Sequence, residues 1–371
     1  MTSNKPPINI FKPFLSLKKT YKGGITKAEL ASEGGKIYKL SSNENIFGAS
    51  PMAIEAIKNN LEALNEYPDR TDQRLRDQLH IFYREELSSD HFIGGPSGSE
   101  VLDMTIRAFI DHDLECIVST PFFLPYQMFS RWQNAKIIDI PMNADDYSVD
   151  ADAILAAITD KTRLLFLTSP NNPTGTYIPK ATLDKIIYNV PDHVVIVMDE
   201  VYFHFADAPD FSTALPYVKE GRKIIALNSF SKAFGLASMR IGYAYTTPEI
   251  SAYIRQIAKP FLINRLSLEA AIAALKDEAF LKMTRDTIIG EREWLYQQLD
   301  QLGISYWKSQ ANFILIQPPI ADNLFAQAML KRGVMVRPSA NFGSPGNIRV
   351  TIGDREANEA YISAVKSCVT G

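Results

Sequence analysis

The sequence contains few of the residues that mark several common protein classes. Its 371 residues include two cysteines, Cys116 and Cys368, which lie far apart in the chain. They form no disulfide framework and indicate a reducing compartment. The five histidines show no pair at the spacing of metal ligands, so we predict no metal site.

The sequence also lacks an excess of one charge and a long hydrophobic run. Lys plus Arg number 39 and Asp plus Glu 42, a formal charge of -3, which gives no electrostatic case for binding nucleic acid. No segment is long and apolar enough to span a membrane. Pro6 and Pro7 interrupt the N-terminal stretch where a signal peptide would need an unbroken apolar run. We therefore expect a cytoplasmic protein with neither a membrane nor a nucleic-acid partner.

What the sequence does contain is typical of a globular protein larger than one ordinary core. Apolar residues make up 46% and charged residues 22% of the chain, and its length favours two domains. Between residues 50 and 260, short runs rich in Ile, Leu and Val alternate with amphipathic stretches. Such runs, apolar on both faces, are typical of a parallel sheet covered by helices. The runs are ECIVST, AKIIDIPM, RLLFLTSP, HVVIVMDE and KIIALNSF.

The pattern predicts an α/β fold with two unequal domains. Residues 50–259 are expected to form a large three-layer α/β/α domain with a mostly parallel sheet, which begins with a helix capped by Ser50. After Pro260 come long helical stretches, then short strands in ANFILIQ, VMVRP and NIRVTIG. We expect residues 1–49 and 260–371 to form a smaller α+β domain from both chain ends.

Polar side chains follow three of the predicted strands. Asn172 follows RLLFLTSP, Asp199 and Tyr202 follow HVVIVM, and Lys232 follows KIIALNSF. Each has a plain structural alternative, since Asn-Pro-Thr-Gly suits a turn, an aspartate can cap a helix, and a loop lysine is usually exposed. Ligands of open parallel sheets bind at the carboxyl ends of the strands. The joint occurrence of these groups therefore indicates one crevice.

These motifs resemble those of the class I and II aminotransferases, pyridoxal-phosphate enzymes of the aspartate aminotransferase fold. The match consists of SPNNPTG, MDEVY and SFSKAFGLASMRIGY, in that order, together with NENIFGASP, EYPD and NIRVTIG. It runs from about residue 40 to the C-terminus. Within the group the sequence is most similar to histidinol-phosphate aminotransferases.

The resemblance implies a role for each strand-end residue. Lys232 would bind pyridoxal phosphate covalently through its amine and then transfer protons, which explains why no acid stands beside it in the sequence. Asp199 would keep the ring nitrogen protonated. Asn172 and Tyr202 would hydrogen-bond the phenolic oxygen, and Phe123 would stack on the ring unless it is an ordinary core residue.

The phosphate of the cofactor is expected at the start of a helix. Free backbone N–H groups and the helix dipole favour an anion there, although Ser97 and Glu100 could also form a capping box. Tyr67 matches a tyrosine that in this family reaches the phosphate of the neighbouring subunit, which implies a homodimer with shared active sites. The other phosphate residues implied by the resemblance are Ser97, Gly98, Ser99, Ser229, Ser231 and Arg240.

The expected substrate residues are Arg349, Arg337 and Asn45. Arg349 matches the arginine that binds the substrate carboxylate in most relatives, and Arg337 matches a second arginine that favours a phosphate. The expected reaction is a ping-pong transfer of the amino group from histidinol phosphate, an amino phosphate, to 2-oxoglutarate.

Two departures from the family pattern leave the substrate open. Phe14 stands where relatives carry a tyrosine that reaches the substrate phosphate, and NENIFG replaces the commoner NENPYG. An aromatic or other neutral amino acid therefore remains an alternative substrate. A decarboxylase or lyase of the same fold, such as one acting on threonine phosphate, is an alternative reaction. A DNA-binding regulator is not expected, because little basic character precedes Ser50.

Overall fold

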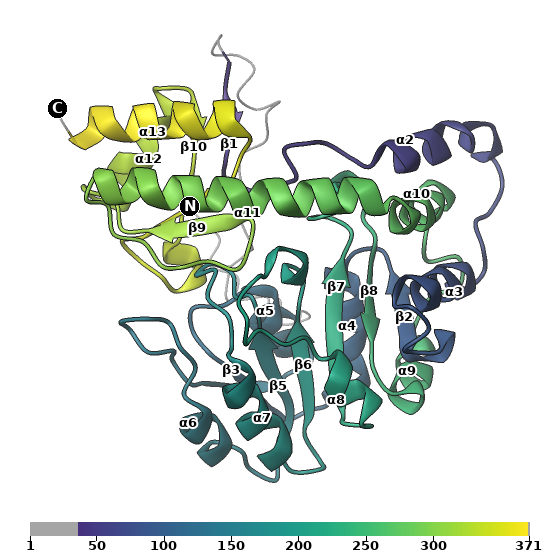
Figure 1. The fold of residues 1–371 in the computed structure, drawn as a ribbon. Helices are drawn as coiled ribbons and strands as arrows, with labels where there is room; N and C mark the ends of the chain where they lie inside the picture. Colours follow the sequence, from purple (N-terminus) through teal and green to yellow (C-terminus); the bar gives the residue numbers. More distant parts are fainter. Residues whose placement is uncertain (1–35, 370–371) are drawn as a thin grey trace, which may run out of the picture.

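The five apolar runs form the parallel part of a seven-stranded sheet in the computed structural model, which describes residues 36–369 (Figure 1). The strand order is β2-β8-β7-β6-β5-β3-β4, and the pairings from β4 across to β7 are all parallel. The predicted α/β class with a mostly parallel sheet is therefore confirmed. The five strands are β3 (Glu115–Val118), β4 (Lys136–Asp139), β5 (Thr162–Thr168), β6 (Val195–Asp199) and β7 (Ile224–Ser229).

Two further strands, which the sequence pattern did not indicate, extend the sheet beyond β7. β8 (Gly242–Tyr245) runs antiparallel to β7, and β2 (Phe92–Gly95) runs antiparallel to β8. Both contain glycines, which are depleted in strands and weaken the strand signal. Their glycines have a packing role, because β8 passes directly against the start of a helix.

Alternate residues of the strands enter two separate cores, so the large domain has three layers. Leu164 and Phe166 pack with α4, α5 and α9 on one face, while Leu165 and Leu167 pack with α6, α7 and α8 on the other. Figure 1 shows α7 and α8 in front of the strands and α4 behind them. The helices of this domain are α2 (Pro51–Lys58), α3 (Gln73–Phe82), α4 (Gly98–Phe109), α5 (Pro125–Trp132), α6 (Ala151–Ala156), α7 (Lys180–Asn189), α8 (Leu215–Lys219), α9 (Pro248–Arg255) and α10 (Arg265–Lys276).

The smaller domain combines the end of the chain with the described part of its beginning. The pair β1 (Tyr38–Lys39) and β10 (Val334–Met335) is parallel, and β12 (Ile348–Thr351) lies between β11 (Arg337–Pro338) and β9 (Phe313–Ile316) with antiparallel pairing. Three helices, α11 (Glu278–Gln301), α12 (Asp322–Leu330) and α13 (Arg355–Val369), complete it. Leu40 belongs to the same core, so residues from both chain ends build this domain.

Helix α10 belongs to the core of the large domain. Its buried residues, including Leu268, Ala271 and Leu275, pack with α2 and α3 in the cluster that covers the large sheet. The change of core falls instead near Leu281 at the start of α11, which touches both clusters. The expected boundary at residue 260 therefore precedes the change of core, because helical periodicity does not tell which sheet a helix covers.

Residues 36–369 also show how the expectations about membrane spans, metal sites and the two cysteines compare with the structure. No helix there is long and apolar enough to cross a membrane, and no three of its His, Cys, Asp and Glu side chains gather as a metal site would require. Cys116 is buried in β3, and Cys368 is partly buried on α13; both are free thiols. Burial raises the pKa of Cys116 to about 12, so this thiol is an unreactive core group.

Candidate active site

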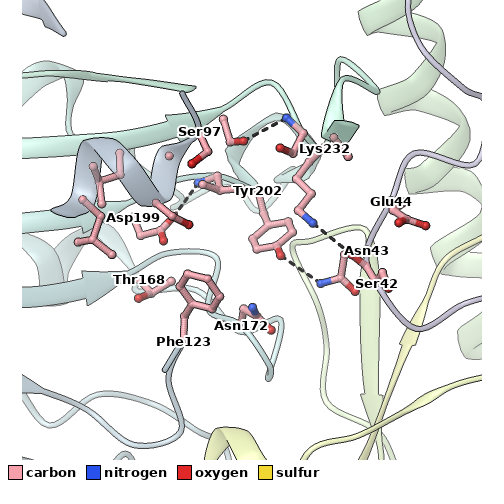
Figure 2. Close-up of a pocket in the computed structure, with 18 of the residues that line it drawn as sticks. Ser42, Asn43, Glu44, Ser97, Phe123, Thr168, Asn172, Asp199, Tyr202 and Lys232 are labelled. Atoms are coloured by element: carbon pink, nitrogen blue, oxygen red, sulfur yellow. Dashed lines mark hydrogen bonds between the residues drawn. The ribbon is translucent and has the colours of Figure 1, made fainter. Parts of the chain in front are cut away.

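A cavity of about 270 Å³ lies at the carboxyl ends of β5, β6 and β7, where the large sheet meets the smaller domain. Its wall includes residues of the segment before α2, the start of α4, and strands β11 and β12. Figure 2 shows Lys232, Asp199, Tyr202 and Phe123 around this space. The residues expected from the sequence that line it are Ser97, Gly98, Ser99, Phe123, Asn172, Asp199, Tyr202, Ser229, Ser231, Lys232, Arg240, Arg337 and Arg349.

Lys232 projects into the cavity and donates a hydrogen bond from Nζ to the carbonyl oxygen of Ser42, at 3.2 Å. Burial, followed by the positive charges of Arg349 and Arg240, lowers the pKa of Lys232 to about 7. Glu44 and Asp199 act in the opposite direction. A substantial fraction of the amine is therefore uncharged at neutral pH, as a nucleophile or proton acceptor requires.

Asp199 lies at the end of β6, with both carboxylate oxygens hydrogen-bonded. Oδ2 accepts a hydrogen bond from the Tyr126 hydroxyl at 2.6 Å, and Oδ1 accepts one from the Val201 N–H at 3.1 Å. Burial raises the pKa of Asp199, while these two hydrogen bonds and Lys232 lower it. The Val201 contact is a local turn bond. The helical turn that follows, Phe203–Phe205, has Tyr202 as its N-cap without a side-chain cap bond, so Asp199 does not cap it.

Tyr202 and Asn172 are held by residues of the smaller domain. The Tyr202 hydroxyl accepts a hydrogen bond from Asn43 Nδ2 at 3.1 Å, and Asn172 Oδ1 accepts one from Arg349 at 2.6 Å. Asn43 is in turn fixed by Thr351 of β12, whose hydroxyl accepts from the Asn43 N–H at 2.9 Å. Hydrogen bonds thus join the two domains at the cavity wall.

Helix α4 begins at the cavity with the residues expected to bind a phosphate. Ser97 is its N-cap, with Oγ accepting a hydrogen bond from the Glu100 N–H at 3.2 Å. The Glu100 carboxylate lies 3.7 Å from Arg107 in an ion pair. The bond from the Glu100 N–H to Ser97 Oγ is one half of a capping box. It occupies only one of the free N–H groups of the first turn. Gly98 and Ser99, which line the cavity, leave room for an anion.

Serines and an arginine from the segment after β7 face this helix end. Ser229 and Ser231 are joined by a hydrogen bond from the Ser231 N–H to Ser229 Oγ, at 3.1 Å. Arg240 follows in a left-handed conformation, with φ of 50°, which is costly for a residue with a side chain. Its guanidinium donates to the Ala237 carbonyl at 3.0 Å and stays at the cavity wall.

Arg337 and Arg349 form a pair of cations opposite the large domain. They are directly opposed residues of the antiparallel strands β11 and β12, so their side chains lie on the same face of the sheet. Both guanidiniums lie over the Phe342 ring, at 5.6 and 5.3 Å from its centroid. Arg349 is buried and also donates to the Ser41 carbonyl at 2.9 Å. This side of the cavity is suited to an anion with more than one negative charge.

Two of the expected site residues do not line the cavity. The Asn45 side chain donates to the Ala233 carbonyl at 3.0 Å and accepts from the Phe47 N–H at 3.0 Å, so it braces the loop that carries Asn43. Tyr67 is 80% exposed and lies away from the cavity. Phe14, the departure noted in the sequence, lies outside the described residues.

Several residues that sequence reasoning missed also belong to the site. They are Ser42, Asn43, Glu44 and Thr168, all at the cavity wall. Asn43 and Glu44 belong to the NENIFG motif, in which the resemblance predicts Asn45 as the site residue. Asn43 has φ of 54°, a conformation that asparagine tolerates better than most residues. The run of consecutive polar residues in SSNEN is the sequence signal that could have indicated these residues as part of the site. Nothing in the sequence linked Tyr126 to Asp199, because 73 residues separate them.

The arrangement fits the cofactor implied by the motifs. Pyridoxal phosphate has an aldehyde, a basic ring nitrogen, an aromatic face and a phosphate. The cavity offers an amine with a lowered pKa at Lys232, a hydrogen-bonded carboxylate at Asp199, an aromatic ring at Phe123, and a helix start beside serines. These groups would bind each part of the cofactor and can transfer a proton at Lys232 Nζ.

Comparison with known proteins supports the same assignment. A family model described as aminotransferase class I and II matches residues 35–365. The chain is 36% identical to histidinol-phosphate aminotransferase 2 of Pseudomonas fluorescens (strain Pf0-1), over 91% of this chain and 90% of that protein. It is also 36% identical to histidinol-phosphate aminotransferase 2 of Carboxydothermus hydrogenoformans, over 94% and 96%.

Solved structures show the same fold. A crystal structure of histidinol-phosphate aminotransferase from Sinorhizobium meliloti in complex with pyridoxal-5'-phosphate is similar, with a TM-score of 0.85. That match covers 97% of this chain and 98% of the other, at 23% identity. Aspartate aminotransferase from Thermus thermophilus, as a single mutant, gives a TM-score of 0.78 at 25% identity, over 91% and 94% of the two chains.

Proposed function

The chain belongs to the class I and II aminotransferases, and on that basis we propose that it uses pyridoxal phosphate to transfer the amino group of histidinol phosphate to 2-oxoglutarate. Pyridoxal phosphate, when bound, supplies the electron sink that amino-group exchange needs. Lys232 Nζ binds the cofactor and moves the proton at the substrate carbon that carries the amine. Asp199 provides the negative charge for the ring nitrogen, and Tyr202 and Asn172 orient the ring oxygen.

The pairing of Arg337 with Arg349 is the observation that supports a phosphorylated substrate. A dianionic phosphate accepts hydrogen bonds from two guanidiniums at once. The register of β11 and β12 sets these groups side by side on the wall that faces Lys232. The curated relatives named above carry the name of this substrate in their own names. A neutral aromatic amino acid carries a single carboxylate, so it has less negative charge than histidinol phosphate to match these two cations.

A comparison of amino donors tests the substrate. We expect the protein to lose the absorption of bound pyridoxal phosphate rapidly with histidinol phosphate, and to regain it with 2-oxoglutarate. Arg337→Gln should lower kcat/KM for histidinol phosphate by about 10- to 100-fold, because a hydrogen bond to a charged group is lost. The same substitution should change kcat/KM for phenylalanine by much less.

Equal losses for both donors would argue against a phosphate role for Arg337. Faster half-reactions with phenylalanine than with histidinol phosphate would favour the aromatic alternative. Release of carbon dioxide or pyruvate without a need for 2-oxoglutarate would identify the decarboxylase or lyase alternative. Failure of the wild-type protein to bind pyridoxal phosphate would contradict the proposed function as a whole.

We also propose that the protein is a cytoplasmic homodimer in which Tyr67 reaches the active site of the neighbouring subunit. The Tyr67 side chain is 80% exposed, and its ring packs 5.0 Å from that of Phe261, which is 42% exposed. Leu64, close by in sequence, is 63% exposed. An exposed aromatic and aliphatic surface of this kind is typical of a subunit interface. The two free thiols agree with a reducing compartment.

A further inference from the structure

The carboxylate of Asp199 depends on a residue from a different layer of the fold. The Tyr126 hydroxyl, from α5, donates a hydrogen bond to Asp199 Oδ2 at 2.6 Å. The other oxygen, Oδ1, accepts from the Val201 N–H at 3.1 Å. Of these two donors, the Val201 N–H is local, and any residue except proline would supply it. The phenol of Tyr126 is the side chain that fixes the rotation of the carboxylate.

The direction of the Tyr126 hydrogen bond is set by a third residue, Thr168. Thr168 Oγ1 donates to the Tyr126 hydroxyl oxygen at 3.1 Å. Thr168 is the last residue of β5 and is paired in register with Asp199 at the end of β6. Because the phenol accepts from Thr168, its own proton is free to point at Asp199. The relay therefore runs from Thr168 through Tyr126 to the carboxylate.

The Tyr126 ring is held in place by aromatic packing. Its side chain is 1% exposed. The ring stacks on Phe166 with centroids 5.1 Å apart and planes 9° apart, and it meets the edge of Phe123 at 5.7 Å. The ring thus has little freedom to rotate its hydroxyl away from Asp199. It also supports Phe123, which lines the cavity.

We propose that Tyr126 is a positioning residue, whose hydroxyl keeps the Asp199 carboxylate ionised and aimed at the ring nitrogen of the cofactor. This inference rests on the proposed function, since the ring nitrogen is the group that Asp199 serves there. Without the phenol, a buried carboxyl group would lose the side-chain donor that stabilises its charged form. Its charged form would then be less favoured, which makes it a weaker counter-ion for a protonated ring.

The protonation states agree with this direction of the hydrogen bond. Burial raises the pKa of Tyr126 well above its ordinary value, and the neighbouring charge of Asp199 raises it further, so the phenol keeps its proton. Burial also raises the pKa of Asp199, and the hydrogen bond from Tyr126 is the largest influence that lowers it. Loss of the hydroxyl therefore shifts the balance toward a neutral carboxyl group.

The test compares two ligands that differ at the ring nitrogen. Cofactor-free wild-type and Tyr126→Phe proteins are titrated with pyridoxal phosphate and with its 1-deaza analogue, which has carbon in place of that nitrogen. We expect Tyr126→Phe to weaken binding of pyridoxal phosphate by about 10-fold or more, the loss typical of a hydrogen bond to a charged group. Binding of the deaza analogue should stay within about 2-fold of wild type, because it makes no use of the Asp199 charge.

A matched control removes a buried hydroxyl elsewhere. Tyr361 on α13 is also 1% exposed, and its hydroxyl has no hydrogen-bond partner among residues 36–369. Tyr361→Phe should leave the affinities for both ligands unchanged. As a second readout, the infrared band of a protonated carboxyl group should appear in cofactor-free Tyr126→Phe and be absent in Tyr361→Phe, with Asp199→Asn used to assign it.

Equal weakening of both ligands would overturn the proposal, because it would mean that Tyr126 shapes the cavity and does not act on Asp199. Unchanged affinity for pyridoxal phosphate would overturn it as well. If Tyr126→Phe does not fold, Thr168→Val tests the same relay while the phenol is retained, and it must show a smaller loss that is again specific to pyridoxal phosphate. If the wild-type protein binds neither ligand, the proposed function itself is refuted. This result is distinct from equal weakening of both ligands and from unchanged affinity in Tyr126→Phe.

Discussion

At the scale of single residues, the environment of Lys232 decides what its amine can do. The sequence places no acid beside it. In the structure burial is the largest cause of its lowered pKa, followed by Arg349, with Arg240 acting in the same direction. Glu44 and Asp199 reduce the effect without reversing it. The Lys232 amine therefore has a lowered pKa even without a bound ligand.

The reactivity of Lys232 in the cofactor-free protein should follow this pKa. A lysine with a lowered pKa is uncharged above that value, so its rate of acylation should rise with pH and level off above about 7. Peptide mass spectrometry after brief treatment with an acylating reagent measures this rate for Lys232 alone.

Two substitutions should move the midpoint in opposite directions. Arg240→Gln removes a positive charge and should raise it, whereas Glu44→Gln removes a negative charge and should lower it. A midpoint near that of an ordinary lysine, or shifts of the same sign in both variants, would contradict this account of the Lys232 environment.

At the scale of elements, the site depends on a close contact between β8 and the start of α4. A Cβ atom added at Gly242 would lie 2.3 Å from the Gly98 nitrogen and 2.7 Å from the Ser97 carbonyl carbon. Both neighbours are backbone atoms of the helix start that we expect to bind the phosphate. Gly242 therefore lets the antiparallel strand β8 support this helix start directly.

Gly242→Ala should damage both stability and cofactor binding. Overpacking against backbone costs about 1–3 kcal/mol of unfolding free energy, and the displaced helix start should bind phosphate less well. Chemical denaturation and titration with pyridoxal phosphate measure the two effects.

Gly290→Ala is the matched control for this substitution. Gly290 is exposed within α11, and an added Cβ would meet no described atom within 4 Å. Alanine there should raise the free energy of unfolding by about 0.5–1 kcal/mol, because glycine is a poor helix former, with cofactor affinity unchanged. Tight cofactor binding in Gly242→Ala would show that the contact with β8 is not needed for the phosphate site.

At the scale of the whole molecule, the cavity exists because two domains meet. The large sheet supplies Lys232 and Asp199, and the smaller domain supplies Arg349 and the loop that carries Asn43. The bonds from Arg349 to Asn172 and from Asn43 to Tyr202 cross this junction. Tyr67 lies outside the cavity of its own chain, which is the arrangement that a site shared between subunits requires.

Mixing two inactive variants tests the proposed sharing. Lys232→Ala should be inactive, and Tyr67→Ala should be strongly impaired through weaker cofactor binding. When the two proteins are unfolded together and refolded, each hybrid dimer should contain one intact site, since a Tyr67→Ala chain keeps its lysine and receives tyrosine from its neighbour. Activity should therefore reappear in the mixture.

The control places both substitutions in one chain and mixes it with wild type. Each such hybrid has a lysine only in the wild-type chain, and that site lacks the neighbouring tyrosine, so the hybrids should add almost no activity. Sedimentation of the wild-type protein as a monomer, or no recovery in the first mixture, would rule out a shared site.

Local sequence accounts for a large part of this protein. The five apolar runs became β3 to β7 because strands buried on both faces need continuous apolar residues, and the residues that follow them lie at one edge because parallel strands end together. Ser50 caps α2 through a hydrogen bond from the Ala53 N–H at 3.2 Å, as the pattern predicted. These features depend on neighbours within a few residues, or on a rule that holds for every sheet of this kind.

Tertiary structure alone decided the features that depend on distant contacts. The register that sets Arg337 opposite Arg349, the hydrogen bond from Tyr126 to Asp199, and the packing of α10 with α2 and α3 all join segments whose separation in sequence carries no signal. The glycine-containing strands β2 and β8 were missed for the same reason. Gly242 of β8 lies against the backbone at the start of α4, and Gly94 and Gly95 of β2 lie against side chains of other elements; periodicity and propensity do not record such close contacts.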